Sequence, residues 1–74
     1  MTPDKTSKKL GKLVEMTRMD KGMSEYEFAQ ALDKNVCYVR KLEGGVLNPY
    51  LVELVNIVEA FDMTFCEFFS RFED

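Results

Sequence analysis

Basic side chains are the groups in this chain whose placement points to chemistry, and that chemistry is phosphate binding. Residues 34–41 carry Lys34, Arg40 and Lys41 and no acid. Residues 1–21 carry six basic and three acidic residues, whereas residues 42–74 carry one basic and seven acidic residues. The net charge of −3 argues against a generic nucleic-acid binder. The uneven distribution would nevertheless orient the molecule on a phosphate backbone, although an ordinary mixed surface is the alternative.

Cysteine is the other residue type with reactive potential, and its use here excludes several classes of site. Cys37 and Cys66 are the two cysteines, and the chain has no histidine and no C-x-x-C pair. Two thiolates would leave the coordination of zinc unfilled, so we expect reduced, partly packed thiols and no metal or cofactor. Without a nucleophile–base constellation or a phosphate-cradling glycine loop, the sequence is not that of an enzyme, and no small-molecule ligand is evident.

The length and composition predict one all-α domain. The chain has 74 residues, of which 46% are hydrophobic and 31% charged, with only four glycines and two prolines. We expect residues 1–74 to form a single domain with residues 1–5 as a flexible tail. No apolar run approaches the roughly 20 residues of a membrane span, and the N-terminus lacks the apolar segment of a signal peptide. The sequence therefore predicts a cytoplasmic protein with no membrane partner.

Helical periodicity and start and stop signals predict five helices. The first begins at a Thr6 or Ser7 cap and runs to about Lys21, and the next two cover roughly residues 25–32 and 36–43. The fourth follows Asn48-Pro49, with Asn48 as cap, and runs to about residue 61, and the fifth covers residues 65–71. The residues expected to face the core are Leu10, Leu13, Val14, Thr17, Phe28, Ala29, Leu32, Val39, Leu42, Leu51, Leu54, Val55, Val58 and Phe61.

The second and third helices are joined tightly enough to form a helix-turn-helix. Ser24 and Glu27 have the spacing of a capping box, and Asn35 can cap the third helix. Only Asp33 and Lys34 lie between the two helices, and aspartate tolerates the left-handed backbone that such a turn requires. A link this short fixes the crossing angle of the pair.

These features resemble the lambda-repressor/Cro-like (XRE-like) helix-turn-helix DNA-binding family. The matching motifs, which extend from about residue 10 to residue 69, include Gly22-Met23-Ser24, Phe28-Ala29, Asn48-Pro49 and Glu67-Phe68-Phe69. The resemblance implies a five-helix lambda-repressor-like DNA-binding domain with the helix-turn-helix at helices 2 and 3. It also implies that Arg18 and Glu43 form a partly buried ion pair that ties helix 1 to helix 3 and has a structural role.

The resemblance further implies which side chains would meet DNA. The positions that would face the major groove are Val36, Cys37, Arg40 and Lys41. Arg40 and Lys41 suit guanine O6 and N7, and Val36 would pack on a thymine methyl. The candidates for phosphate contacts are Lys34, Asn35, Tyr38, Lys12 and Asn48. For Tyr38, a role at the edge of the core is equally open.

The expected function is a sequence-specific transcriptional regulator, in particular a repressor, that binds double-stranded DNA as a homodimer. A single recognition helix reads only a few base pairs, so useful specificity requires two half-sites. The C-terminal helix, within residues 64–74, would supply the dimer interface through the four phenylalanines Phe65, Phe68, Phe69 and Phe72. The alternative is a protein-interaction module, such as an antirepressor or antitoxin-like partner. Its support is the net acidity, the apolar start of helix 3, and Glu25 at a position where the family often has a phosphate-binding glutamine.

Overall fold

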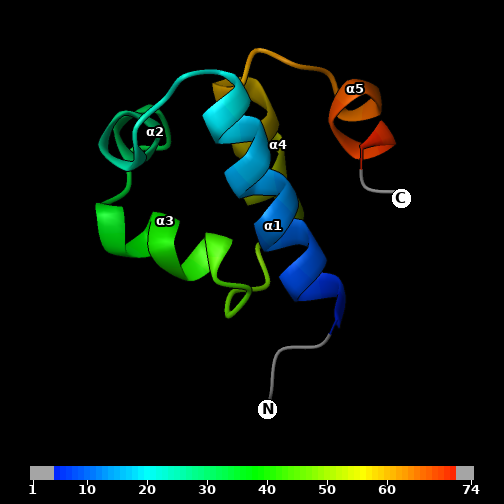
Figure 1. Cartoon of the computed structure of the whole chain (residues 1–74), viewed down its shortest axis with the longest axis horizontal. Helices are drawn as coiled ribbons and strands as arrows, with labels where there is room; N and C mark the ends of the chain where they lie inside the picture. The colour runs from blue at the N-terminus through cyan, green and yellow to red at the C-terminus, as the bar shows by residue number, and fades with distance from the viewer. Residues whose placement is uncertain (1–4, 72–74) are drawn as a thin grey trace.

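The computed structural model describes residues 5–71, and these residues form five α-helices without a strand. The helices are α1 (Lys5–Asp20), α2 (Glu25–Ala31), α3 (Val36–Glu43), α4 (Leu51–Ala60) and α5 (Phe65–Ser70). Helix α1 crosses in front of α4, while α2 and α3 lie on one side of this pair and α5 lies on the other (Figure 1). The predicted all-α, five-helix fold with a helix-turn-helix at α2 and α3 is confirmed.

Each of the first four helices ends in the same way, at a residue with a left-handed backbone. These residues are Gly22, Asp33, Gly45 and Asp62, with φ between 58° and 80°. The N–H of the next residue donates back across the last helical turn, for example from Lys34 N to Ala29 O at 2.9 Å. This pattern satisfies carbonyls that a helix end would otherwise leave unpaired, and it turns the chain sharply. The left-handed Asp33 gives the two-residue link between α2 and α3 its shape.

The core joins all five helices and contains a column of aromatic rings. Phe28 of α2 stacks on Phe61 at 4.7 Å between ring centroids, and Phe61 lies 6.1 Å from Phe68 of α5. All three rings are at most 1% exposed. Burial of a phenylalanine side chain stabilises a fold by about 1.5–3 kcal/mol. The column therefore attaches α5 firmly to the helix-turn-helix.

Backbone contact between α1 and the end of α3 sets the position of α3. Gly11 is buried in the middle of α1. A Cβ atom at this residue would lie 2.6 Å from the carbonyl oxygens of both Leu42 and Glu43. Only glycine allows two helix backbones to approach so closely at this point.

Two expectations about where helices begin and one about a core residue were wrong, and tertiary contacts explain the differences. Helix α1 already begins at Lys5, and Ser7 is buried within its first turns, where its hydroxyl donates to Asn48 Oδ1. Because Asn48 is engaged by Ser7, α4 begins later than predicted, with Tyr50 at the cap position and its N–H donating to Glu53 Oε1 at 2.8 Å. With this later start, Leu51 is 70% exposed instead of facing the core.

No helix within residues 5–71 is long and apolar enough to span a bilayer.

Candidate nucleic-acid interface

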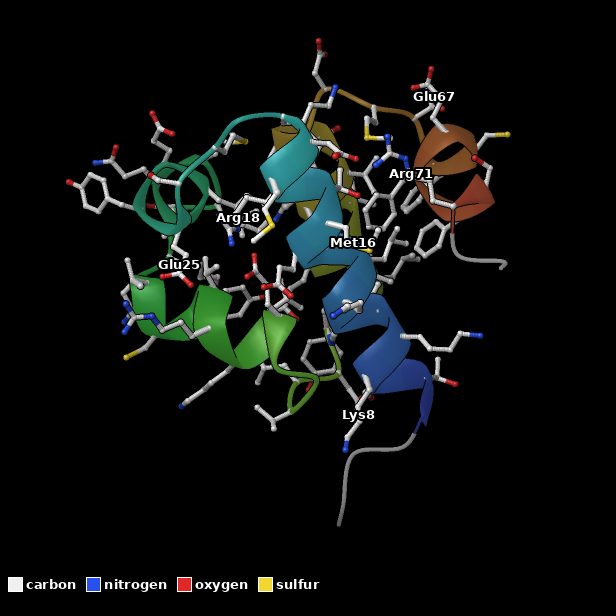
Figure 2. The ribbon with its side chains drawn as sticks, viewed as in Figure 1. Lys8, Met16, Arg18, Glu25, Glu67 and Arg71 are labelled. Atoms are coloured by element: carbon white, nitrogen blue, oxygen red, sulfur yellow. The ribbon has the colours of Figure 1, made fainter. Side chains whose placement is uncertain are left out.

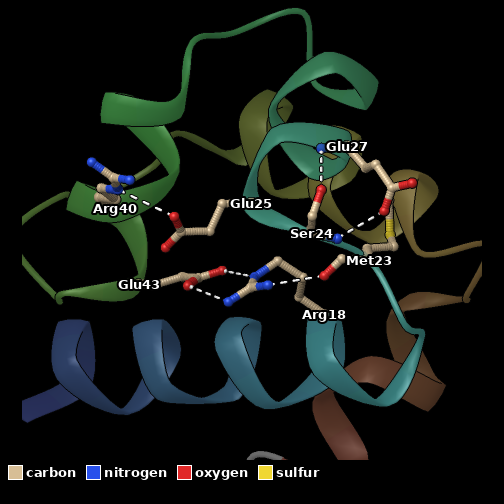
Figure 3. A network of polar contacts seen from close by, with 7 residues as sticks. All are labelled: Arg18, Met23, Ser24, Glu25, Glu27, Arg40 and Glu43. Atoms are coloured by element: carbon tan, nitrogen blue, oxygen red, sulfur yellow. Dashed lines mark hydrogen bonds and ion pairs between the residues drawn. The ribbon is translucent and has the colours of Figure 1, made fainter.

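Local capping builds the α2–α3 pair as the sequence predicts. Ser24 Oγ accepts from Glu27 N at 3.0 Å, and Ser24 N donates to Glu27 Oε1 at 2.8 Å (Figure 3). At the start of α3, Asn35 Oδ1 accepts from Tyr38 N at 2.9 Å. Each bond satisfies a backbone or side-chain group that the first helical turn would otherwise leave to water. The two helices therefore begin at defined residues, which fixes the direction of every side chain along α3.

A buried ion pair ties α3 to α1. Arg18 Nε lies 2.7 Å from Glu43 Oε2, and Arg18 Nη2 donates to Glu43 Oε1 at 3.3 Å (Figure 3). The remaining Nη1 donates to the carbonyl oxygen of Met23 at 2.9 Å. The two charged side chains are only 9% and 7% exposed. The hydrogen bond to Glu43 raises the pKa of Arg18 above its ordinary value, and these contacts leave Arg18 committed to the scaffold.

The outer face of α3 carries three of the four side chains predicted to face the groove. Val39 and Leu42 are the buried residues of α3. By contrast, Cys37, Arg40 and Lys41 are exposed. Val36 is only half-exposed and packs against the core, because it lies three residues before Val39 on the same side of the helix. The exposed face therefore presents two cations and a thiol, and Val36 borders it.

Arg40 has an acidic partner that the sequence analysis did not find. Its Nε donates to Glu25 Oε1 at 3.2 Å, from the second turn of α3 to the first residue of α2 (Figure 3). The Arg40 side chain is 68% exposed and the Glu25 side chain 36%. The two residues are fifteen positions apart, so neither helical periodicity nor local spacing relates them. Only the crossing of α2 and α3 brings them together.

Most of the predicted phosphate-binding groups gather at the start of α3. Lys34, Asn35 and Tyr38 line one open depression together with residues that include Cys37 and Lys41. Lys34 Nζ lies 5.2 Å from the centroid of the Tyr38 ring. This depression brings two lysines and the amide of the α3 cap, which are donors suited to a phosphate oxygen, to one place beside the carboxylate of Asp33.

The other phosphate candidates lie in different surroundings. Lys12 is exposed on α1 and is not among the residues that line the depression. Asn48 is exposed but shares its amide oxygen with Ser7. Tyr38 is half-buried, and its pKa is raised by burial and then by the negative charge and hydrogen bond of Glu53. Its hydroxyl is thus directed to Glu53, which fits a role at the edge of the core.

Of the phenylalanines predicted to form the dimer interface, Phe68 was assigned wrongly, whereas the side chains of Phe65 and Phe69 are at least partly exposed. Phe68 is fully buried in the aromatic column, so it is not available to a partner. Phe65 is 40% exposed and stacks on the half-buried Phe69 at 5.7 Å. Phe72 lies outside the described residues. A second group of apolar side chains, which we call the α4-start patch, is 57–80% exposed and consists of Val46, Tyr50, Leu51 and Val52.

Solved structures with the same arrangement of helices belong to transcription regulators. The wild-type restriction-modification controller protein C.Esp1396I matches with a TM-score of 0.87 at 19% identity, covering 93% of this chain and 91% of that one. The same controller, as a tetramer in complex with its natural 35 base-pair operator, matches with a TM-score of 0.86 at 19% identity, covering 93% and 91%. The clp gene regulator ClgR from C. glutamicum matches with a TM-score of 0.86 at 21% identity, covering 95% and 90%.

At 19–21% identity, these similarities show that the chain shares its fold with these two proteins. The resemblance to lambda-repressor/Cro-like domains is therefore confirmed for the fold. No protein-family model and no curated protein sequence matches the chain.

Proposed function

We propose that this protein is a sequence-specific DNA-binding transcriptional regulator, in particular a repressor, that inserts α3 into the major groove. The observation that carries this proposal is the outer face of α3. It presents the exposed Arg40 and Lys41 on a helix that is fixed by caps, by the core and by a buried ion pair. The fold neighbours add support, since they are regulators and one of them is bound to its operator. The same comparison favours a regulator over an enzyme, and a regulator of this kind acts in the cytoplasm.

The proposed division of roles follows from exposure and chemistry. Arg40 and Lys41 donate hydrogen bonds to guanine, while Cys37 and the edge of Val36 make apolar contacts with base edges. Lys34 and Asn35 bind phosphate beside the start of α3 and set the register of the protein on the duplex. Lys12, Tyr38 and Asn48 are further phosphate contacts in this proposal, and the surroundings of Tyr38 and Asn48 make them its weaker members.

The protein would act as a homodimer, because two copies of α3 are needed to read a site of useful length. Within residues 5–71, the two candidate apolar surfaces for the contact between copies lie on α5 and at the start of α4. One is the exposed part of Phe65 with Phe69 on α5, and the other is the α4-start patch. Support from the comparisons is the tetramer that the controller protein forms on its operator.

A protein-interaction module on the same scaffold is the second candidate. The observation that favours it is the α4-start patch, since large exposed apolar side chains mark surfaces that bind other proteins. The net charge of −3 points the same way.

Selection from a random duplex library at two salt concentrations tests the proposal. A specific binder enriches a palindromic site and loses affinity steeply as salt rises. Arg40→Ala should reduce discrimination at one guanine in each half-site, by about 5- to 150-fold for a lost bidentate contact of 1–3 kcal/mol. Lys21→Ala removes one exposed charge outside the proposed interface and serves as the control. A library with no enriched sequence, or equal behaviour of the two variants, would favour the protein-interaction module.

A further inference from the structure

The ion pair between Glu25 and Arg40 uses one particular donor of the guanidinium. The bond to Glu25 Oε1 comes from Arg40 Nε, at 3.2 Å. An arginine has five N–H donors, and the other four are on the two terminal Nη atoms. Recognition of guanine O6 and N7 requires two parallel donors from one guanidinium. A carboxylate at Nε therefore leaves the pair of donors that reads guanine available.

Glu25 is the less exposed partner of this ion pair. It is the first residue of α2, directly after the Ser24 cap, and its side chain is 36% exposed, whereas that of Arg40 is 68% exposed. Its charge also helps to raise the pKa of the buried Arg18, although Glu43, which raises that pKa, and burial, which lowers it, have larger effects. Figure 3 shows Glu25 reaching from α2 towards Arg40 on α3, beside the buried Arg18–Glu43 pair.

We propose that Glu25 is a positioning and specificity-determining residue that holds Arg40 for end-on recognition of guanine and disfavours non-specific contact with phosphate. This inference rests on the proposed DNA-binding function. A flexible arginine loses side-chain entropy when it binds a base, and a partner that restrains it beforehand reduces this loss. The same negative charge, at the surface that approaches the duplex, repels phosphate oxygens and weakens binding to arbitrary sequences.

Two substitutions separate the positioning effect from the charge effect. Glu25→Gln removes the charge and the ion pair together. Glu25→Asp keeps the charge but shortens the side chain by one methylene, which breaks the contact with Arg40. Glu27→Gln is the matched control, because Glu27 is also an acid in the first turn of α2, and it bonds to the Ser24 cap instead of Arg40. Glutamine is compatible with that capping role.

The measurement is binding to the selected operator, to its variants with each guanine replaced, and to an unrelated duplex. We expect Glu25→Gln and Glu25→Asp to reduce discrimination at the Arg40-dependent guanine by about 3- to 5-fold, the upper range for an exposed ion pair. Only Glu25→Gln should also raise affinity for the unrelated duplex. In an Arg40→Ala background, neither substitution should change discrimination at that position, and Glu27→Gln should not change it in either background.

Each outcome decides between the proposed function and this inference. An operator selected by the unsubstituted protein, with discrimination unchanged by both Glu25 substitutions, leaves the function standing and overturns the role of Glu25. An equal loss of discrimination with and without Arg40 overturns it as well, because Glu25 would then act without Arg40. If no operator is selected at all, both proposals fall together.

Discussion

Removal of Glu43 should cost this small domain a large part of its stability. The Arg18 side chain, 9% exposed, would keep its charge but lose two hydrogen bonds to carboxylate oxygens and retain only the Met23 carbonyl. Loss of one partner of a buried ion pair costs about 3–5 kcal/mol. A domain of this length has a free energy of unfolding of about 4–11 kcal/mol, at 0.05–0.15 kcal/mol per residue. Glu43→Ala should therefore reduce the free energy of unfolding by roughly 3 kcal/mol.

Urea unfolding followed by circular dichroism measures the effect, with the free energy obtained by linear extrapolation. The control is Asp20→Ala, which breaks the Arg71–Asp20 pair at 3.1 Å, whose side chains are 40% and 61% exposed. Exposed pairs contribute at most about 1 kcal/mol, so this loss should be small. The double variant Arg18→Met with Glu43→Leu should recover most of the stability, because it leaves no buried charge. A loss for Glu43→Ala no greater than that for Asp20→Ala, or no recovery in the double variant, would refute the reasoning.

Three further predictions concern the backbone and one tyrosine. Gly11→Ala should destabilise the fold by about 1–3 kcal/mol through overpacking, although alanine favours a helix, and a raised melting temperature would contradict the close approach of α1 and α3. Asp33→Ala should cost about 1 kcal/mol in urea unfolding, whereas Asp33→Gly should not destabilise, because alanine fits poorly at a φ of 59°. The folded-state pKa of Tyr38 is raised above its ordinary value near 10, so its contribution to stability is present below that pH and lost as pH rises through the folded pKa. Ultraviolet titration of the folded protein should show one late tyrosine, and Tyr38→Phe should remove it; three equal titrations would contradict the burial of Tyr38.

Local sequence predicted the parts of the fold that depend on neighbouring residues. The Ser24 capping box, the Asn35 cap and the left-handed Asp33 are each determined within a few positions, and all are present. The Arg18–Glu43 pair came from a resemblance to known proteins, because no local rule relates residues 25 positions apart. Family knowledge thus supplied the contact that spacing could not.

The errors occurred where a distant residue competes for a group. Asn48 precedes a proline, as a helix cap often does, but its side chain accepts a hydrogen bond from Ser7, 41 positions away. Helix α4 begins instead at Leu51. Phe68 is an apolar side chain of the kind found at interfaces, but the ring of Phe61 lies against it in the core. Hydrophobicity alone does not distinguish a core residue from a dimer contact. The partnership of Glu25 with Arg40 was missed for the same reason, since it exists only once α2 and α3 cross.

The aromatic column has a consequence for how the molecule opens. A helix of only six residues, such as α5, would by itself lose its structure within the native state. Phe68 prevents this, because its fully buried ring cannot leave without exposing Phe61 and, behind it, Phe28 of α2. The slowest-exchanging amide hydrogens of α5 and of the helix-turn-helix should therefore share one opening free energy. The last helix and the surface that carries Arg40 belong to a single cooperative unit.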